Sequence, residues 1–563
     1  MEDRVKVAAV EEGHAHPISD ERAVLPELFD RAVTSYGSLR AIDFLGRTWT
    51  FGEIGECVDR AAAGLQGLGV GPGSRVGLCL PNTPYYVIFY FAVLKTGATV
   101  VNFNPLYTAH EIEAQVRDSG ATVMVVMDLE RIYRPTASIA ERAGLAHLIV
   151  CPMADALPSV KGLLFRLFKR RERARVPADA RHVGYASLVQ AGGAFRPVTI
   201  APEDLAVLQY TGGTTGTPKG AMLTHRNLVA NVRQVVAHGG PAFREGEERV
   251  LCVLPFFHIF ALTVALNLAV VIGGEMVLMP QFKLEDLLKT IARRRPTVLP
   301  AVPTLYGAIA TAAETRTLDL SSIRTCISGG APLPADIRTR FESLTGCRLA
   351  EGYGLTETSP VVSCNLLAGG ENRDGSAGLP LPETIIEIRN PDEPHRLLPQ
   401  GEKGEVCIRG PQVMAGYLNR PVETEAVMVE GAIRTGDIGY LDDDGYLFLV
   451  DRIKDLIICS GYNVYPRMIE DALYEHEDVS EAVVIGVADA YRGETPKAFV
   501  TLREGAGTTS EQLLAFLATR VSKIEMPSSL EIRTTLPRTM VGKLSKKELV
   551  EEEKARAKMS TAS

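Results

Sequence analysis

The chain is 563 residues long, which exceeds a single compact core and predicts about three or four domain-sized units. Its apolar content of 46% is typical of a globular protein and excludes a disordered one. The net charge of −8, from 60 basic and 68 acidic residues, argues against a protein that binds nucleic acid through bulk charge. The nine cysteines are scattered without a C-x-x-C pair, so we expect reduced thiols rather than disulfides or a zinc site.

Residues 49–328 alternate helical patterns with short β-branched runs. A helix is predicted over Phe51–Leu68, with Thr50 as its N-cap and Glu53 at the capping-box position. Short buried strands are predicted at Arg75–Leu80, Thr99–Phe103, Thr122–Met127, Val250–Leu254, Glu275–Met279, Val298–Pro300 and Thr325–Ser328. Because strands and helices alternate, we expect an α/β fold with stacked, mostly parallel sheets.

One apolar stretch, Leu251–Ile272, has the 22 residues that a membrane-spanning helix needs. It contains Pro255, His258 and Asn267, and Gly273-Gly274 follows it directly. We therefore expect a buried strand, helix and strand here. The start of the chain carries no apolar segment of the secretory type, so a cytoplasmic location is predicted.

The C-terminal part changes character twice. Residues 380–450 contain short strands broken by Gly, Pro and Asp, which is typical of an antiparallel, β-barrel-like subdomain with a hairpin turn at Asp442–Gly445. A new α/β pattern then begins, with helices at Pro466–Glu475 and Ser510–Val521 and strands at Val479–Gly486 and Ala498–Leu502. The predicted domains are therefore an N-terminal domain of residues 1–452 and a C-terminal α+β domain of residues 453–563.

A basic patch at Val160–Arg175 places seven Lys and Arg residues around five Leu and Phe residues. Such a segment can form an amphipathic helix at an anionic membrane surface, or an ordinary solvated loop. Both interpretations stay open from the sequence.

The most informative segment is the loop Tyr210–Gly220, which is rich in Gly and Thr and follows a short apolar run. Its backbone N–H groups and hydroxyls can cradle phosphate oxygens, and Lys219 adds a positive charge. Pro218 stands where a Walker A motif has Gly before Lys, so the loop is a phosphate cradle of a different kind.

This loop, continued to Leu228, closely resembles the signature of the acyl-adenylate-forming (AMP-binding) superfamily. Further segments are similar to that family's motifs in the same order: Leu254–Phe260, Ser328–Pro332, Glu351–Thr358, Thr435–Asp437, Asp451–Lys454 and Pro537–Leu544. The resemblance covers residues 25–550 and is strongest to bacterial long-chain fatty acyl-CoA synthetases. It implies ATP and coenzyme A as co-substrates, Mg²⁺ as cofactor, and a small C-terminal domain that is mobile.

The resemblance also implies the site residues. Lys543, Thr356 and Glu357 are expected to be catalytic, with Glu357 and Thr211 holding the metal. The expected ATP-binding residues are Thr211, Gly212, Gly213, Thr214, Thr215, Gly216, Thr217, Lys219, Gly330, Ala331, Pro332, Glu351, Gly352, Tyr353, Gly354, Thr356, Asp437 and Arg452. His258 and Phe257 are expected at the acyl pocket or its gate, Lys454 at the hinge, and Ser460 and Gly461 in a loop on the coenzyme A side.

These roles make physical sense for the residue types. Tyr353 offers a flat face for adenine, and the carboxylate of Asp437 can accept hydrogen bonds from both ribose hydroxyls. Glu357 is a hard oxygen ligand that suits Mg²⁺. Lys543 can stabilise charge that builds between the substrate carboxylate and the α-phosphate. Without the motifs, each would more simply be a packed aromatic or a solvated charge.

The predicted reaction activates a fatty acid as acyl-AMP with release of pyrophosphate, and then forms acyl-CoA. The segment Phe256–His258 supplies no carboxylate to pair a substrate ammonium, which favours an acid with a neutral tail. A medium-chain or aromatic acid:CoA ligase is the alternative, although Ser460 stands where aryl ligases carry Lys. A binding protein with a dead site is disfavoured because Thr356, Glu357 and Lys543 are all present. Homodimer formation is left open, and no nucleic acid is expected.

Overall fold

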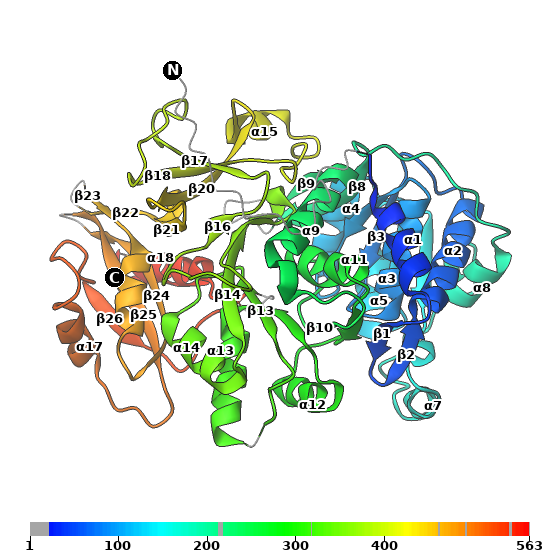
Figure 1. Cartoon of the computed structure of the whole chain (residues 1–563), viewed down its shortest axis with the longest axis horizontal. Helices are drawn as coiled ribbons and strands as arrows, with labels where there is room; N and C mark the ends of the chain where they lie inside the picture. The colour runs from blue at the N-terminus through cyan, green and yellow to red at the C-terminus, as the bar shows by residue number, and fades with distance from the viewer. Residues whose placement is uncertain are drawn as a thin grey trace.

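Two large, mostly parallel sheets form the body of the protein (Figure 1). The computed structural model describes residues 22–211, 218–316, 318–459, 462–489, 492–539 and 543–561. In spatial order the seven-stranded sheet contains β7 (His182–Gly184), β6 (His147–Cys151), β5 (Val123–Met127), β3 (Arg75–Cys79), β4 (Thr99–Asn102), β8 (Leu205–Thr211) and β9 (Lys219–Thr224). The nine-stranded sheet contains β16 (Leu379–Pro380), β15 (Val361–Cys364), β14 (Arg348–Gly354), β13 (Thr325–Gly329), β12 (Val298–Ala301), β10 (Arg249–Cys252), β11 (Glu275–Leu278), β1 (Arg40–Phe44) and β2 (Arg47–Thr50). The predicted α/β class and parallel sheets are confirmed.

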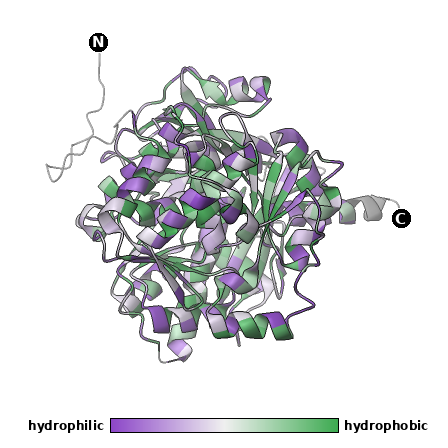
Figure 2. Cartoon of the chain, turned by 90° about the vertical axis from the view of Figure 1, so that its right-hand side faces the viewer, coloured by the Kyte–Doolittle hydropathy of each residue, from purple (hydrophilic) through white to green (hydrophobic). Residues whose placement is uncertain are grey.

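Helices cover and separate these sheets. They are α1 (Leu25–Tyr36), α2 (Phe51–Gly67), α3 (Pro84–Lys95), α4 (Ala109–Ser119), α5 (Glu130–Ile139), α6 (Met153–Ala156), α7 (Ser159–Phe168), α8 (Tyr185–Ala191), α9 (His225–Gly239), α12 (Leu284–Arg294), α13 (Pro303–Thr315) and α14 (Ala335–Thr345). Helix α2 begins with the predicted capping box, in which the Thr50 side chain accepts from the Glu53 backbone N–H and Glu53 accepts in return. Every residue of α3 is buried, as expected of a helix that is apolar on all sides. Figure 2 shows the hydrophobic strands inside and the hydrophilic positions on the outer helices.

The apolar stretch Leu251–Ile272 is the predicted strand, helix and strand. It runs from β10 through α10 (Ile259–Ala261), a π-helical turn (Leu262–Asn267) and α11 (Leu268–Val271) towards β11. Two buried polar side chains find partners inside, since Thr263 donates to the Ser359 carbonyl at 2.6 Å and Asn267 donates to the Tyr90 hydroxyl at 3.3 Å. Among the described residues, no helix has the length and apolar character needed to cross a membrane.

The predicted antiparallel insert is a five-stranded sheet. Its strands are β17 (Ile385–Arg389), β18 (Gly404–Arg409), β20 (Ala432–Leu441), β19 (Met428–Val429) and β21 (Leu447–Arg452), and α15 (Pro421–Val427) precedes β19. The turn at Asp442 is closed by the Asp442 N–H, which donates to the Tyr446 carbonyl at 3.1 Å. Residues 415–418 attach this sheet to β9, because the Met222 and Leu418 N–H groups donate to the Gly416 and Gly220 carbonyls.

The chain then crosses to a small C-terminal sheet through a single 3₁₀ turn, Ile453–Asp455. This part contains β22 (Ile457–Cys459), β23 (Tyr462–Val464), α16 (Pro466–Tyr474), β24 (Val479–Asp489), β25 (Gly493–Leu502), α17 (Ser510–Leu517), β26 (Ser529–Ile532) and α18 (Lys546–Thr561). It has hydrophobic clusters of its own around Val484 and Phe499. Helix α17 ends at Leu517, not at Val521 as predicted, because the chain tightens there into turns in which Arg520 N–H donates to the Leu517 carbonyl. The domain boundary after Arg452 stays a prediction.

Candidate functional site

A cavity of about 2810 Å³ lies where the large sheets meet the small C-terminal part. It is larger than an ordinary ligand pocket of about 300–1,000 Å³, because it includes the space between the two parts of the chain. The predicted site residues that line it are Thr211, Phe257, His258, Gly330, Ala331, Pro332, Glu351, Gly352, Tyr353, Gly354, Thr356, Glu357, Asp437, Arg452, Lys454 and Lys543. Gly212, Gly213, Thr214, Thr215, Gly216, Thr217, Ser460 and Gly461 lie outside the described residues.

Tyr353 and Asp437 form one wall of the cavity. Strand β14 delivers Tyr353, and its hydroxyl donates to the Asp437 carboxylate at 2.6 Å. Arg452 is paired with Asp437 in the β20–β21 register, and its Nε lies 3.2 Å from the same carboxylate. Burial, followed by the negative charge of Asp437, raises the pKa of Tyr353 well above its usual value, so the phenol stays a proton donor. The arrangement presents a fixed aromatic face beside a carboxylate.

A close backbone approach shapes the end of β14. A Cβ at Gly354 would lie 1.8 Å from the Pro360 carbonyl oxygen, so only glycine fits there. The chain then turns through the 3₁₀ segment Thr356–Thr358, which carries Glu357. The Glu357 carboxylate accepts a hydrogen bond from the Tyr417 hydroxyl at 2.7 Å.

The predicted phosphate-binding lysine, Lys219, lies against Tyr417 and is not in the cavity lining. Lys219 begins β9, and its Nζ lies 5.1 Å from the centre of the Tyr417 ring. A cation over an aromatic face is held electrostatically. Lys219 and Glu357 are therefore linked through one side chain, Tyr417.

Glu357 and Thr211 are chemically suited to Mg²⁺, which takes oxygen ligands and keeps several waters or phosphate oxygens of a bound nucleotide. Both line the cavity. In the described part of the chain no group of three or more His, Cys, Asp and Glu side chains is arranged to hold a metal by itself. The residues therefore fit a metal that is shared with substrate phosphates, and do not fit an all-protein metal cage.

Lys543 enters the cavity from the C-terminal part. Its carbonyl accepts a hydrogen bond from the Thr539 N–H at 2.7 Å. A Cβ at Gly330 would lie 2.6 Å from Lys543 Cε and 3.0 Å from its Nζ, so the missing side chain of Gly330 makes room for the lysine. Desolvation in the cavity, followed by repulsion from Arg452, lowers the pKa of Lys543 from 10.5 to about 8.

His258 and Phe257 line the same cavity as Lys543. His258 caps the start of α10, where its Nδ1 accepts from the Phe260 N–H at 3.4 Å. Burial, followed by the charge of Lys543, lowers the pKa of His258 to about 3, so its ring is neutral at physiological pH. A neutral, capped imidazole suits packing or gating better than proton transfer.

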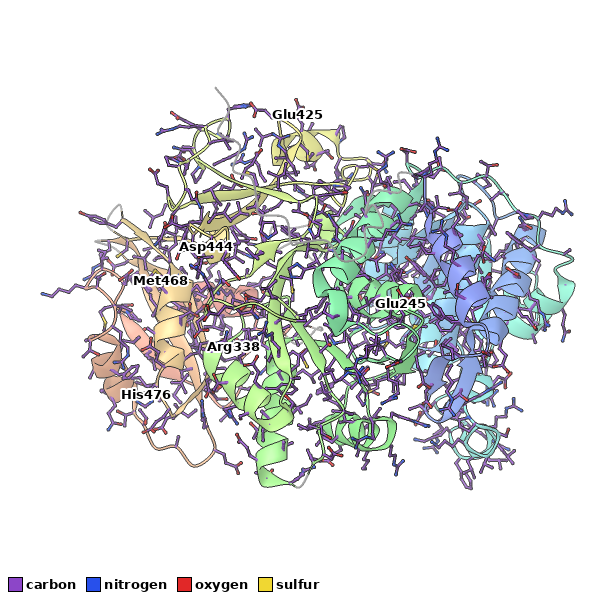
Figure 3. The ribbon with its side chains drawn as sticks, viewed as in Figure 1. Glu245, Arg338, Glu425, Asp444, Met468 and His476 are labelled. Carbon is purple, nitrogen blue, oxygen red and sulfur yellow. The ribbon has the colours of Figure 1, made fainter. Side chains whose placement is uncertain are left out.

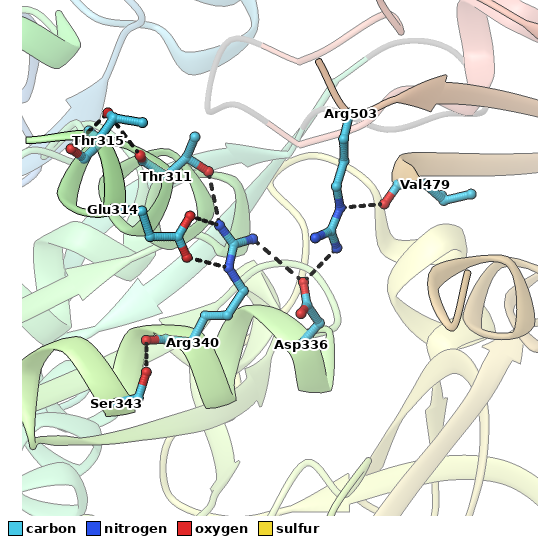
Figure 4. Close-up of polar contacts among 9 residues, drawn as sticks. Thr311, Glu314, Thr315, Asp336, Arg340, Ser343, Val479 and Arg503 are labelled. Carbon is cyan, nitrogen blue, oxygen red and sulfur yellow. Dashed lines mark hydrogen bonds and ion pairs between the residues drawn. The ribbon is translucent and has the colours of Figure 1, made fainter. Parts of the chain in front are cut away.

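Contacts across the two parts of the chain hold this arrangement. Arg503, at the end of β25, donates to Asp336 of α14 at 2.9 Å. Figure 4 shows that Asp336 also faces Arg340, which makes a bidentate pair with Glu314. Figure 3 places Met468 of α16 and Arg338 of α14 on the two sides of the same border.

Glu351 is buried at this border too. Its carboxylate accepts from the Leu333 N–H at 3.2 Å. Burial raises the pKa of Glu351 to about 7, although Arg467 opposes the shift. The hinge candidate Lys454 has a lowered pKa, through burial and then the charge of Arg452.

Sequence reasoning missed Tyr417, Arg503 and Asp336. Tyr417 lies 60 residues from its partner Glu357, and no local pattern separates it from other loop aromatics. Arg503 and Asp336 are 167 residues apart in the sequence, where each is typical of a solvated charge. The roles of these residues become visible only in the folded structure. For Tyr417, the antiparallel pairing with Ala221 shows that it lies beside β9.

The fold and the cavity define an enzyme of the adenylate-forming class. The sequence pattern "AMP-binding enzyme" matches residues 29–418, and "AMP-binding enzyme C-terminal domain" matches residues 468–543. The chain therefore belongs to the AMP-binding enzyme family, as its motifs predicted.

Named relatives and solved structures agree with this assignment. The chain is 41% identical to a long-chain-fatty-acid–CoA ligase of Bacillus subtilis, over 96% of both proteins. It is 36% identical to a feruloyl-CoA synthase of Amycolatopsis sp, over 90% of this chain and 94% of that protein. The structure of ATP-bound MatB from Rhodopseudomonas palustris is similar with a TM-score of 0.81 at 29% identity, covering 94% of this chain and 98% of that one. An anthranilate CoA ligase in complex with anthranoyl-AMP gives a TM-score of 0.84 at 25% identity, covering 95% of this chain and 98% of that one.

Proposed function

We propose that this protein is an ATP-dependent ligase that joins a long-chain fatty acid to coenzyme A through an acyl-adenylate. The observation that carries the proposal is the convergence of Lys543, from the C-terminal part, with Tyr353, Asp437 and Glu357 in one cavity. The likeness to a long-chain-fatty-acid–CoA ligase over nearly the whole chain supports the fatty acid as substrate.

In the first step a carboxylate oxygen attacks the α-phosphorus of ATP. The α–β phosphoanhydride bond breaks and pyrophosphate leaves, so the products are acyl-AMP and pyrophosphate. Tyr353 would stack on adenine and Asp437 would accept from the ribose hydroxyls, while the positive charge of the Lys543 ammonium would stabilise the negative charge between the two reactants. Glu357 and Thr211 would hold Mg²⁺, which when bound neutralises triphosphate charge.

In the second step the thiolate sulfur of coenzyme A attacks the acyl carbonyl. The bond from the carbonyl to the phosphate oxygen breaks and AMP leaves, while the proton that the thiol gave up in forming the thiolate has passed to solvent. Lys543 occupies the cavity in this structure, so we propose that the C-terminal part rotates about Lys454 between the steps. Ser460 and Gly461 would then face the cavity.

A second candidate is a ligase for a medium-chain or aromatic acid. The likeness to a feruloyl-CoA synthase and to an anthranilate CoA ligase supports it. We further propose that the protein can form a homodimer and that it can be located peripherally at a membrane. The exposed apolar side chains of α7 support the peripheral membrane location.

ATP–pyrophosphate exchange, measured with acids of increasing chain length and with benzoate, tests the proposal. We expect exchange that is fastest with long-chain acids and, after addition of coenzyme A, a thioester of the same acid. Exchange with no acid would overturn the adenylation reaction. Exchange with benzoate alone would replace the fatty acid by an aromatic substrate.

A further inference from the structure

Helix α7 presents an apolar face that no other described part of the chain covers. The exposed fractions are 72% for Val160, 57% for Leu163, 47% for Leu164, 50% for Leu167 and 78% for Phe168. Their spacing of three and four residues places these side chains on one side of a helix about 15 Å long. In Figure 1 α7 projects from the lower edge of the molecule beneath β1 and β2, away from the C-terminal part.

The opposite face of α7 is firmly attached. Gly162 lies so close to α6 that a Cβ there would be 2.5 Å from the Ala154 carbonyl oxygen, and Phe165 packs against the main core. Lys161 donates to the Leu45 carbonyl at 2.7 Å, and Arg166 pairs with Asp155. The outward face is therefore a fixed surface of a folded element and not the side of a loose loop.

The neighbouring hairpin carries a further exposed apolar residue. Leu45, at the turn between β1 and β2, is exposed and carries the carbonyl that Lys161 binds. Arg47 follows it, with its guanidinium 4.6 Å from the centre of the Trp49 ring. Exposed apolar and basic residues are thus found on both of these neighbouring elements.

Positive charge surrounds this face. Residues 160–175 hold seven basic residues and one acidic residue, Glu172, in a chain whose net charge is −8. Lys169 pairs with Glu172 and Arg173 with Asp128. Arg170, Arg171 and Arg175 are exposed and form no ion pair within the described ranges, so their charges are available to a partner.

We propose that α7, with the basic residues 169–175, is a docking surface for an anionic lipid bilayer. A basic helix with an exposed apolar face lies in the headgroup region, where lipid covers the apolar side chains and anionic headgroups attract the flanking Lys and Arg. A nucleic acid would leave the five apolar side chains without a role. A second copy of this chain fits poorly, because it would bring two basic clusters together and because a stable dimer interface needs roughly 20–30 residues a side.

The proposed function gives this surface a purpose, since a long-chain acid partitions into lipid, but binding to the bilayer does not depend on that function.

The test uses the full chain and vesicle co-sedimentation. Vesicles of phosphatidylcholine mixed with phosphatidylglycerol are compared with vesicles of phosphatidylcholine alone, at low and at high salt. The double variant Leu167→Gln/Phe168→Gln removes apolar area, and Arg170→Glu/Arg171→Glu reverses charge.

We expect binding to the mixed vesicles that high salt weakens, and little binding to phosphatidylcholine alone. Each double variant should lose at least about tenfold in vesicle affinity, because both the buried apolar area and the headgroup attraction contribute. Matched controls are Val422→Gln/Ile385→Gln, which removes equally exposed apolar side chains elsewhere, and Arg131→Glu/Lys523→Glu. Both controls should bind as the unaltered protein does.

Equal binding by the unaltered protein and the α7 variants would overturn the proposal, and so would equal binding to both kinds of vesicle. Sedimentation of the protein without lipid measures its oligomeric state, which tests whether a second copy occupies this surface. A dimer that Leu167→Gln/Phe168→Gln converts to monomer would assign the surface to a second copy instead. ATP–pyrophosphate exchange in the same variants should be unchanged with a short, water-soluble acid that the protein accepts, so a folding defect is detected separately. Failure of the proposed reaction would appear as absent exchange with normal vesicle binding.

Discussion

The two walls of the cavity are built in different ways. On one wall, Tyr353 of the nine-stranded sheet donates a hydrogen bond to Asp437 of the five-stranded sheet, and Arg452 of that second sheet forms an ion pair with the same carboxylate. Lys543, on the opposite wall, comes from the C-terminal part and reaches Gly330 through contacts that cross the border between them. The first wall is preformed whenever the nine-stranded and five-stranded sheets are folded against each other, whereas the second exists only in this placement of the C-terminal part. Binding of the nucleotide and chemistry on its α-phosphate should therefore be separable by mutation.

The largest separation is expected from Lys543→Ala. The adenylation half-reaction should fall by about 10²–10³-fold, because a group aimed at developing charge is removed. Thioester formation from preformed acyl-AMP should be nearly unchanged. The affinity for ATP should be nearly unchanged as well if the wall of Tyr353 and Asp437 binds the nucleotide. The two half-reactions are measured as pyrophosphate exchange and as release of AMP from added acyl-AMP.

Equal loss in both half-reactions would contradict the proposed rotation of the C-terminal part. Lys543→Arg is the matched control for charge. It keeps the cation but places a larger, planar group against Gly330, so partial activity is expected.

The next effect is a pH dependence that belongs to Lys543 alone. Its pKa is lowered to about 8, so the ammonium is charged below that pH and is neutralised as the pH rises through it. The kcat/KM for adenylation should therefore begin to fall as the pH approaches about 8 and should fall by up to about tenfold per pH unit above it, since the charged fraction of Lys543 falls in that proportion.

Lys543→Arg supplies the control for this profile as well, because the guanidinium stays charged. The alkaline fall should vanish in that variant. An alkaline fall that persists there would have another source.

The sequence predicted the wall of Tyr353 and Asp437 better than it predicted the contacts that position Lys543. Thr50–Glu53, Tyr353 and Asp437 belong to short local patterns whose meaning does not depend on distant residues. The end of α17 at Leu517 was missed because the helical pattern continues through the turns that follow it. Tyr417 and the pair Arg503–Asp336 could not be inferred, since they acquire a role only when segments 60 and 167 residues apart meet. For residues 160–175 the sequence left an amphipathic helix and a solvated loop open, and the structure shows helix α7 and which of its faces is exposed.

Tyr353→Phe tests the wall that Tyr353 and Asp437 form. The ring that would stack on adenine remains, but the hydroxyl that orients Asp437 is lost and Arg452 holds the carboxylate alone. We expect the KM for ATP to rise by roughly tenfold, as for loss of one hydrogen bond to a charged group, with a smaller change in kcat.

Tyr446→Phe is a matched control, because its hydroxyl donates to the Glu371 carbonyl and not to a site residue. It should leave the KM for ATP unchanged. A fall in kcat without a rise in KM for Tyr353→Phe would mean that the hydroxyl acts on the reaction and not on the nucleotide.

The smallest effect is expected at the border between the two parts of the chain, from Arg503→Ala. Arg503 and Asp336 are each 40% exposed, so their ion pair contributes at most about 1 kcal/mol to the placement of Lys543. Adenylation should slow by roughly twofold to threefold and become less sensitive to salt, while thioester formation from acyl-AMP should be equal or slightly faster. The control is Arg520→Ala, whose pair with Glu475 lies wholly within the C-terminal part. Asp336→Ala should add little to Arg503→Ala if both act through this pair, whereas additive losses would mean that Asp336 acts mainly through Arg340.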